Sequence, residues 1–236
     1  MPQRLAIVIP TYNERENIRR LLLTLLELLP QARLFVVDDN SPDGTAKAVQ
    51  EIALERSQVR LIWREQKFGL ASAYLDAFAR ILPDPSIDYI ATMDADLSHN
   101  PAELLELLRH AAEHDLVVGS RYVPGGAVLN WALWRRFISQ FGNTYTRRVI
   151  GAPIFDLTAG FVVYTRELLA KILPEVEERE PYAYQTEMKY LSYKAGARIK
   201  EVPIIFRERA SGKSKLKNRA IFEALFFPWY LRFFKQ

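Results

Sequence analysis

Two aspartates separated by one small residue form the strongest chemical signal in the sequence. Asp94, Ala95 and Asp96 directly follow an apolar run at residues 89–93. Carboxylates one residue apart at the end of a buried strand can hold a hard divalent cation, with water and ligand phosphates completing its coordination shell. A structural role also fits, because Asp96 or Ser98 could cap the helix that follows. The position at a strand end, opposite other acidic loops, favours cation binding.

A second acidic loop follows the apolar run at residues 34–37. Asp39 can accept hydrogen bonds from a ribose or a base, as the acidic residue of dinucleotide-binding folds does. The segment from Asn40 to Gly44 is typical of tight turns. No glycine-rich phosphate loop follows the first apolar run, so the sequence disfavours a nicotinamide or P-loop nucleotide site.

The loop after the first apolar run, PTYNE at residues 10–14, combines a rigid ring, a flat aromatic ring and a carboxylate. Pro10, Tyr12 and Glu14 could therefore contact a ligand. The same residues suit the start of a helix, with Asn13 as its cap and Glu14 stabilised by the helix dipole. The two interpretations are compatible.

Basic residues gather in the later part of the chain. Arg121 follows the apolar run at 116–119, and Arg135 and Ser139 lie four residues apart, on one face of a helix. Guanidinium groups match phosphate oxygens, and lysines add point charge. Residues 198–236 contain ten Lys or Arg and three Glu, a net charge of +7, against −3 for the rest of the chain. This basic end indicates an anionic partner: nucleic acid, phospholipid or a phosphorylated ligand.

Short apolar runs alternate with helical patterns through the first half of the chain. Strands are expected at residues 5–9, 34–37, 59–63, 89–93 and 116–119, and helices at 14–29, 43–56, 70–82 and 101–113. Near-continuous apolar runs are typical of parallel strands buried on both faces. The order predicts an α/β fold with a mostly parallel sheet between two layers of helices. The ligand site is expected at the carboxyl ends of the strands.

The second half of the chain alternates less regularly. It is expected to add helices at residues 130–151 and 184–195 and strands at 161–164 and 198–206, completing the same sheet rather than forming a second domain. Residues 219–234 form an amphipathic aromatic segment. Glu223, Pro228 and Arg232 interrupt it, so it falls short of the ~20 apolar residues that span a bilayer. It either lies in a membrane interface or packs on the core as a terminal helix.

Composition excludes several classes of site. The chain has 236 residues, no cysteine and three histidines, and 49% of its residues are hydrophobic. The absence of cysteine excludes a disulfide framework, a thiolate zinc site and a cysteine nucleophile. Three histidines leave little room for a metal site built from imidazoles. The apolar share is enough for a folded core, which rules out a disordered chain.

A series of motifs carries a family resemblance. PTYNE, VVDDNSPDGT, MDADLSHNP, GSRYV, DLTAGF, YQTEM and RASGKSKL occur in this order between about residues 5 and 218. The series resembles the family 2 inverting glycosyltransferases of the GT-A fold, and among them the polyprenol (dolichol) monophosphate mannose synthases. The resemblance implies a single Rossmann-like GT-A domain over residues 1–218, a three-layer sandwich. An amphipathic aromatic helix at 219–236, a candidate membrane-interface segment, would follow it.

The resemblance also implies an activity: transfer of mannose from GDP-mannose to a polyprenyl phosphate, either dolichyl or undecaprenyl, with Mg²⁺ or Mn²⁺ as the cofactor. The nucleotide sugar would contact Pro10, Tyr12, Glu14, Val37, Asp39, Asp94, Ala95, Asp96, Arg209 and Lys215. The metal would lie at Asp94, Asp96 and Ser98. The acceptor phosphate would meet Arg121, Arg135 and Ser139. The implied catalytic residues are Asp96, Arg121 and Arg209.

The implied acceptor bears on the chemistry. A phosphate monoester has a second pKa near ~6, so at neutral pH it is already largely the nucleophilic anion and needs no general base. We therefore predict that Glu187 is not an essential base. The protein is expected to be cytoplasmic and peripheral at the cytoplasmic face of a membrane, held there by its own surface or by a membrane-anchoring subunit.

Three other functions compete with this one. Transfer of glucose or another hexose from a UDP-sugar to polyprenyl phosphate uses the same chemistry, and the residues alone do not separate the two donors. A non-catalytic module that binds a nucleotide sugar or an anionic lipid has no physical need for the pair Asp94 and Asp96 or for Arg209. A nucleic-acid partner is not expected, because the basic loop lacks a platform on which bases could stack.

Overall fold

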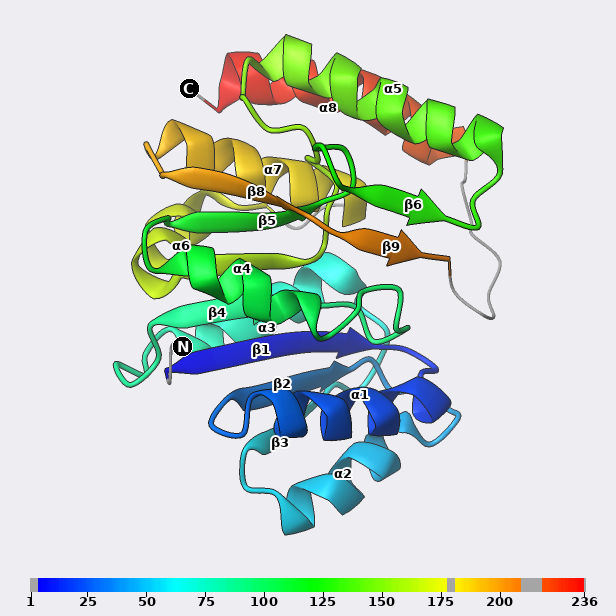
Figure 1. Cartoon of the computed structure of the whole chain (residues 1–236), viewed down its shortest axis with the longest axis vertical. Coiled ribbons are helices and arrows are strands. Elements are labelled where there is room, and N and C mark those ends of the chain that lie inside the picture. The colour runs from blue at the N-terminus through cyan, green and yellow to red at the C-terminus, as the bar shows by residue number, and fades with distance from the viewer. Residues whose placement is uncertain (1–3, 178–180, 209–217, 236) are drawn as a thin grey trace.

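One mixed sheet organises the molecule, in a computed structural model that describes residues 4–177, 181–208 and 218–235. Within these residues seven strands pair in the order β3-β2-β1-β4-β7-β5-β8 (Figure 1). Their bounds are β1 Leu5–Thr11, β2 Arg33–Asp38, β3 Val59–Trp63, β4 Tyr89–Thr92, β5 Leu116–Ser120, β7 Val162–Thr165 and β8 Ile199–Pro203. β7 runs antiparallel to β4 and β5, and the other pairs are parallel. The expected mostly parallel sheet is confirmed.

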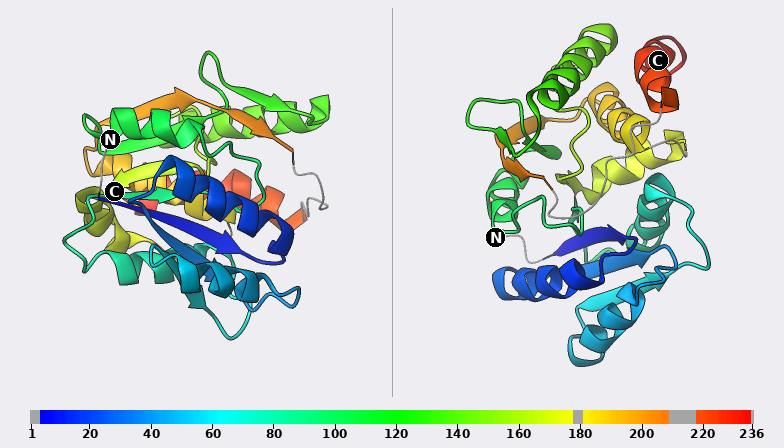
Figure 2. Two further views of the ribbon diagram at one scale, coloured as in Figure 1. Left: turned by 60° about the horizontal axis from the view of Figure 1, so that its bottom comes forward. Right: turned by 90° about the vertical axis from the view of Figure 1, so that its right-hand side faces the viewer.

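Helices cover both faces of this sheet (Figure 2). α1 Arg15–Leu28, α2 Thr45–Glu55 and α4 Glu103–Ala111 pack on one face, and α3 Leu70–Ile81, α6 Arg166–Ile172 and α7 Pro181–Lys194 pack on the other. Along β1, Ile7 points into the first layer and Val8 into the second, and both are fully buried. Burial on both faces is the reason that β1, β2, β4 and β5 are nearly continuous apolar runs.

The segment expected as one strand at 198–206 is two strands. β8 ends at Pro203, and β9 Ile205–Arg207 pairs with β6 Ala127–Leu129 in a separate two-stranded sheet. The chain switches partner at Ile204, whose backbone N–H donates to Ser120 while its carbonyl accepts from Ala127. β6 and α6 were not expected from the sequence, because three and seven residues are too few to show a repeating pattern.

Two helices lie beyond the sheet, side by side (Figures 1 and 2). α5 Leu133–Ile150 matches the helix expected at 130–151, and α8 Asn218–Phe234 continues through Pro228. Phe227 and Leu231 of α8 are buried against Ile150 and Ile154, so the aromatic segment packs on the core along one side. No helix within the described residues is long and apolar enough to cross a bilayer.

Candidate active site

The paired aspartates lie just beyond the end of β4, against the segment that leads into β7. The Thr92 hydroxyl donates to the Gly160 carbonyl at 2.7 Å, which ties this segment to β4. A Cβ on Gly160 would lie 3.6 and 3.7 Å from the two carboxylate oxygens of Asp94. Gly160, the glycine of DLTAGF, to which the sequence assigned no role, therefore lies directly beside the Asp94 carboxylate.

The backbone between the second aspartate and Ser98 orients the Asp96 carboxylate. Leu97 has a φ of 60°, a left-handed conformation that costs energy for a side chain of this type. This turn allows the Ser98 N–H to donate to Asp96 Oδ1 at 3.0 Å. Both side chains are buried, and the Ser98 hydroxyl finds no hydrogen-bond partner within the described residues.

The oxygen atoms around Asp94 and Asp96 fit a hard divalent cation, which prefers oxygen ligands. Among the residues that the structure describes, no cluster of three or more His, Asp or Glu could hold a metal by itself. Two carboxylates and the hydroxyl of Ser98 leave coordination positions for water and phosphate oxygens. The residues therefore suit a cation that binds together with a diphosphate better than a permanent metal centre.

A buried histidine backs this site. His99 Nδ1 lies 4.0 Å from Asp94 Oδ2, and the imidazole stacks on Phe161 with the ring centroids 5.0 Å apart. Burial lowers the pKa of His99 against the opposing effect of the two aspartates. The imidazole is therefore neutral at physiological pH and adds no positive charge to the pair of carboxylates.

Asp39, expected to bind the nucleoside, is already engaged within the protein. Its carboxylate accepts from the Arg64 guanidinium and, at 2.9 Å, from the backbone N–H of Gly69. Arg64 also donates to the Gly69 carbonyl at 3.0 Å and to Ser72 at 2.9 Å. The pair therefore closes the loop after β3. Sequence reasoning missed Arg64, because it is distant from Asp39 along the chain and belongs to no recognised motif.

The other expected nucleoside contacts lie at the ends of β1 and β2. Pro10 and Val37 are paired neighbours in the two strands, and the Val37 side chain is buried in the core, so only its backbone can face a ligand. Tyr12 is exposed, with Lys67 Nζ 3.5 Å from its ring centroid. Glu14 accepts from Asn17 at the start of α1. These residues share one edge of the sheet, as expected.

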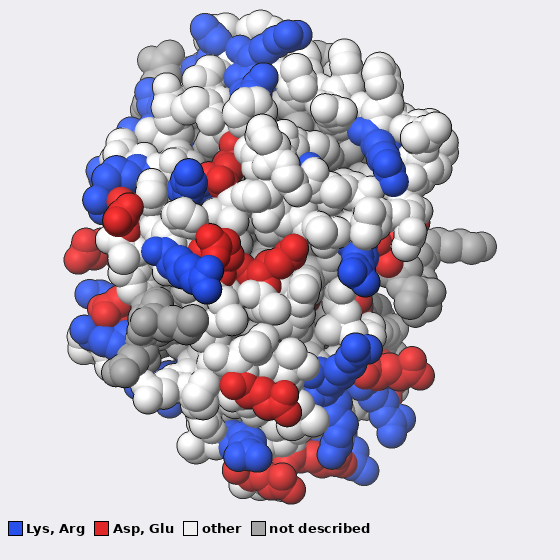
Figure 3. Space-filling view, viewed as in Figure 1, with Lys and Arg blue, Asp and Glu red and all other residues white. Residues whose placement is uncertain are grey.

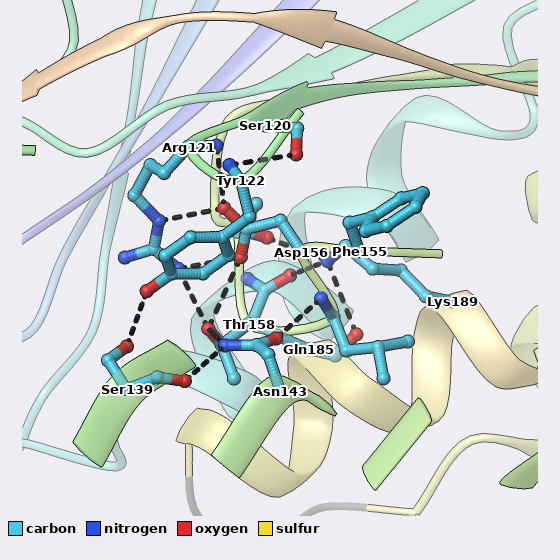
Figure 4. A network of polar contacts seen from close by, with 12 residues as sticks. Ser120, Arg121, Tyr122, Ser139, Asn143, Phe155, Asp156, Thr158, Gln185 and Lys189 are labelled. Atoms are coloured by element: carbon cyan, nitrogen blue, oxygen red, sulfur yellow. Dashed lines mark hydrogen bonds and ion pairs between the residues drawn. The ribbon is translucent and has the colours of Figure 1, made fainter. Parts of the chain in front are cut away.

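Arg121 at the end of β5 is held in a bidentate ion pair (Figure 4). Its Nε and Nη2 each donate to Asp156 at 2.7 Å, and Nη2 also donates to Thr158 at 2.8 Å. Burial alone would raise the pKa of Asp156, but the Arg121 guanidinium and its hydrogen bonds hold that pKa below the ordinary value. The expected acceptor cation therefore has its charge balanced inside the protein. The sequence did not reveal Asp156 as the partner of Arg121.

The expected acceptor residues come together through aromatic side chains. The Tyr122 and Ser139 hydroxyls lie 2.7 Å apart, and the Arg135 guanidinium lies 4.1 Å from the ring centroid of Trp131. The Arg121 guanidinium lies 5.9 Å from the centroid of the same Trp131 ring. Arg121, Arg135 and Ser139 thus form one neighbourhood. Sequence reasoning missed Trp131, although a tryptophan beside two basic side chains was a usable signal.

Two further expectations concern other parts of the chain. Arg209 and Lys215, the expected diphosphate contacts, lie outside the described residues. Glu187, predicted from the sequence not to be an essential base, is fully buried, with its Oε1 3.6 Å from Lys235 Nζ just after α8.

Comparison with known proteins identifies relatives over most of the chain. Residues 6–173 match the model of glycosyl transferase family 2. A polyprenol monophosphomannose synthase of Mycolicibacterium smegmatis is 43% identical over 227 residues, covering 95% of this chain and 85% of the relative. An undecaprenyl-phosphate mannosyltransferase of Micrococcus luteus is 39% identical over 94% of this chain and 91% of its own length. A dolichol-phosphate mannosyltransferase of Pyrococcus furiosus is 35% identical over 94% of this chain but 62% of its own length.

Solved structures share the fold. Glucosyl-3-phosphoglycerate synthase of Mycobacterium tuberculosis, in complex with Mn²⁺, UDP-glucose and phosphoglyceric acid, superposes with a TM-score of 0.66 at 18% identity, over 95% of this chain and 79% of that one. A mannosyltransferase of Pyrobaculum calidifontis, in complex with GDP-mannose and Mn²⁺, gives 0.61 at 18% identity, over 94% and 60%. The fold and the sequence relatives agree, and the chain belongs to glycosyl transferase family 2, among the polyprenyl-phosphate mannosyltransferases.

Proposed function

We propose that this protein transfers mannose from GDP-mannose to the phosphate of a polyprenol. One observation carries the proposal beyond the relatives' names: a single segment, residues 156–161, serves two sites. Asp156 at its start holds Arg121, and Gly160 near its end lies against Asp94. A site that suits a cation with its diphosphate is thereby joined to a site with an oriented guanidinium. Such a connection supports a reaction between two anionic substrates.

On the donor side, Asp94 and Asp96 would hold the divalent cation, with Ser98 next to them. Mn²⁺ is present in the two structural neighbours described above, and Mg²⁺ has the same preference for oxygen ligands. A bound cation of this kind offsets the negative charge that develops on the departing nucleoside diphosphate. The protein's own contribution is to fix both carboxylates through Gly160 and the turn at Leu97.

On the acceptor side, an oxygen of the lipid phosphate would attack the anomeric carbon of mannose. The new carbon–oxygen bond forms as the bond to GDP breaks, and GDP leaves with the electron pair, which inverts the anomeric configuration. Arg121, Arg135 and Ser139 would receive the phosphate. No side chain needs to remove a proton, because the attacking oxygen is already ionised. The position of Glu187 beside Lys235 supports the prediction that it is not a base.

The lipid acceptor requires contact with a membrane, and α5 and α8 supply a suitable surface. Both helices expose large apolar side chains: Leu133, Trp134, Phe137, Ile138 and Phe141 on α5, and Leu225, Phe226, Trp229, Phe233 and Phe234 on α8. A groove of about 520 Å³ between them is lined by aromatic side chains and by Arg148 and Arg232. Over α5, Figure 3 shows basic and uncharged atoms.

Exposed aromatic rings with arginines are typical of proteins that lie in the interface of an anionic bilayer. We therefore propose peripheral binding through α5 and α8 at the cytoplasmic face, where GDP-mannose would be present. A membrane-anchoring subunit could share this surface.

Incubation with polyprenyl phosphate, Mg²⁺ or Mn²⁺ and a panel of labelled GDP- and UDP-sugars tests the proposal. We expect label in the lipid phase from GDP-mannose. Label from UDP-glucose alone would assign the chain to the competing donor, and no label from any sugar would contradict lipid glycosylation altogether.

A further inference from the structure

α7 carries a lysine that is fully buried inside the molecule. Lys189 Nζ donates to the Ala159 carbonyl at 2.7 Å, and to the backbone carbonyl and the side-chain oxygen of Gln185, each at 3.3 Å (Figure 4). An ammonium group has three N–H donors and no acceptor, so three oxygens satisfy it completely. The surroundings of Lys189 therefore match its charged form.

The strongest of these bonds reaches the segment that joins the two proposed substrate sites. Ala159 lies between Asp156, which holds Arg121, and Gly160, which lies against Asp94. Lys189 thus fixes the segment at its centre, from the helix layer behind the sheet. A change at Lys189 would be felt first by the Arg121–Asp156 pair, because Asp156 and Arg121 are the charges that act most strongly on the lysine.

The balance of buried charge gives the lysine a second role. The ion pair of Arg121 and Asp156 carries no net charge. The Glu201 carboxylate lies beside it, accepting from the backbone N–H groups of Phe155 and Asp156 at 2.8 and 2.9 Å. Without Lys189 this group would carry a net negative charge, which opposes the approach of a phosphate dianion. Arg135 does not restore the balance by itself, because Glu208 accepts from it at 2.6 Å.

We propose that Lys189 is a positioning residue for the acceptor phosphate, whose buried ammonium holds the 156–161 segment and supplies the positive charge that lets the Arg121–Asp156 pair accept a phosphate. The inference rests on the proposed lipid-phosphate acceptor. It concerns a side chain that does not itself touch the substrate.

The charge of Lys189 responds to pH near neutrality. Burial lowers its pKa to about 7; Asp156 and Glu201 act to raise the value, and Arg121 lowers it. A phosphate dianion bound nearby favours the ammonium form. At pH 8 the binding of the acceptor should therefore be accompanied by uptake of a proton, and the affinity for the acceptor should fall as the pH rises above 7.

The helices α3, α6 and α8, which pack on α7, bring other titratable groups towards it. Tyr74 of α3 stacks on Tyr184, and burial holds the pKa of Tyr74 well above its ordinary value. Lys171 of α6 donates to the Ala195 carbonyl. Lys235, directly after α8, pairs with Glu177 and has its pKa raised, so it remains charged.

Kinetics of three chains test the proposal: wild type, Lys189→Met, and Lys194→Met as a matched control, because Lys194 is exposed on the same helix. At pH 7 we expect Lys189→Met to raise the KM for polyprenyl phosphate roughly tenfold, with kcat and the KM for GDP-mannose changed less than about twofold. Above pH 7 the wild-type KM should rise towards that of the variant. The second ionisation of the acceptor phosphate, with a pKa of about 6, is the same for all three chains. It therefore cancels in the ratio of the variant KM to the wild-type KM.

Calorimetry of polyprenyl phosphate binding to the wild type, without donor, gives a second readout that needs neither turnover nor a folded variant. Measured at pH 8 in buffers of different ionisation enthalpy, proton uptake that approaches one per phosphate supports the proposal, and no uptake overturns it. If Lys189→Met raised the KM for polyprenyl phosphate and the KM for GDP-mannose equally, with a ratio of variant to wild-type KM that did not change with pH, Lys189 would be purely structural. A wild type that binds the lipid with proton uptake but transfers no sugar would contradict the proposed function and leave the role of Lys189 standing.

Discussion

The Thr92 hydroxyl, at the end of β4, donates a hydrogen bond of 2.7 Å to the carbonyl of Gly160, in the segment that leads into the antiparallel neighbour β7. Thr92 is the last residue of β4, two before Asp94, and Gly160 lies near the end of the 156–161 segment. The bond therefore makes the proposed donor site and the proposed acceptor site parts of one rigid edge of the sheet.

Gly160→Ala should leave the fold intact and impair the donor site. An added Cβ would make ordinary contacts of 3.6 to 3.8 Å with Asp94 and Gln185, so no backbone clash is expected. The methyl group would nevertheless occupy space beside the Asp94 carboxylate. We expect an unchanged melting temperature and a KM for GDP-mannose raised several-fold. Gly142→Ala, on α5 with open space around it, is the control; equal kinetics in the two variants would contradict the placement of the donor.

Arg121→Ala should weaken both the acceptor site and the fold. Removal of the guanidinium leaves the Asp156 carboxylate buried without its partner, and loss of one member of a buried pair typically costs about 3–5 kcal/mol of unfolding free energy. We expect a lower melting temperature, a raised KM for polyprenyl phosphate and a nearly unchanged affinity for GDP-mannose. The double variant Arg121→Met with Asp156→Leu should recover stability without recovering activity. Lost donor affinity would show that the roles were assigned wrongly.

Lys189 should make the unfolding free energy depend on alkaline pH. Its pKa is about 7 in the folded protein against 10.5 ordinarily, so between these values the unfolded chain binds more protons than the folded one. Stability therefore rises with pH across this window, and the penalty of burying the charge is complete below pH 7. Denaturant unfolding at pH 7, 8.5 and 10 should show this rise in the wild type relative to Lys189→Met. Parallel profiles for the two chains would contradict the low pKa.

Binding to vesicles should depend on the exposed aromatic residues of α5. The double variant Trp134→Ser with Phe137→Ser removes two large side chains from the proposed membrane surface. Burying one such side chain is worth about 1.5–3 kcal/mol, so cosedimentation with anionic vesicles should fall at least roughly tenfold. Leu54→Ser on α2, also highly exposed, is the control and should bind as the wild type does. Equal binding by both variants would place the membrane contact elsewhere.

The sequence revealed the parts of the fold and the site that are local in the chain. β1, β2, β4 and β5 were visible because each is an apolar run buried on both faces, and β3 because it is mostly apolar although one of its faces is exposed. Asp94 and Asp96 were visible because one residue separates them. Partners distant along the chain were not visible. Arg64 on Asp39 and Asp156 on Arg121 are contacts that only the folded sheet brings together.

Gly160 is another residue whose role depends on a contact made only in the folded sheet. Its neighbours in the sequence indicate a turn-like segment, whereas its proposed role depends on the Asp94 carboxylate, which lies against it from just beyond β4. The short strand β6 was not predicted, because three residues show no repeating pattern, and β9 was predicted only as the end of one strand at 198–206. The burial of Lys189 was not predicted, because a lysine within a helix is usually exposed to solvent.

Transfer of labelled mannose by the wild type and by Asp96→Asn, with Asp76→Asn at a partly exposed position of α3 as the control, tests the central claim most directly. The acceptors are polyprenyl phosphate, unphosphorylated polyprenol and 3-phosphoglycerate. We predict that the wild type and the control label polyprenyl phosphate alone, and that Asp96→Asn remains folded but loses about a hundredfold or more of the rate. Transfer to polyprenol or phosphoglycerate, or full activity in Asp96→Asn, would contradict a cation-assisted attack by a lipid phosphate.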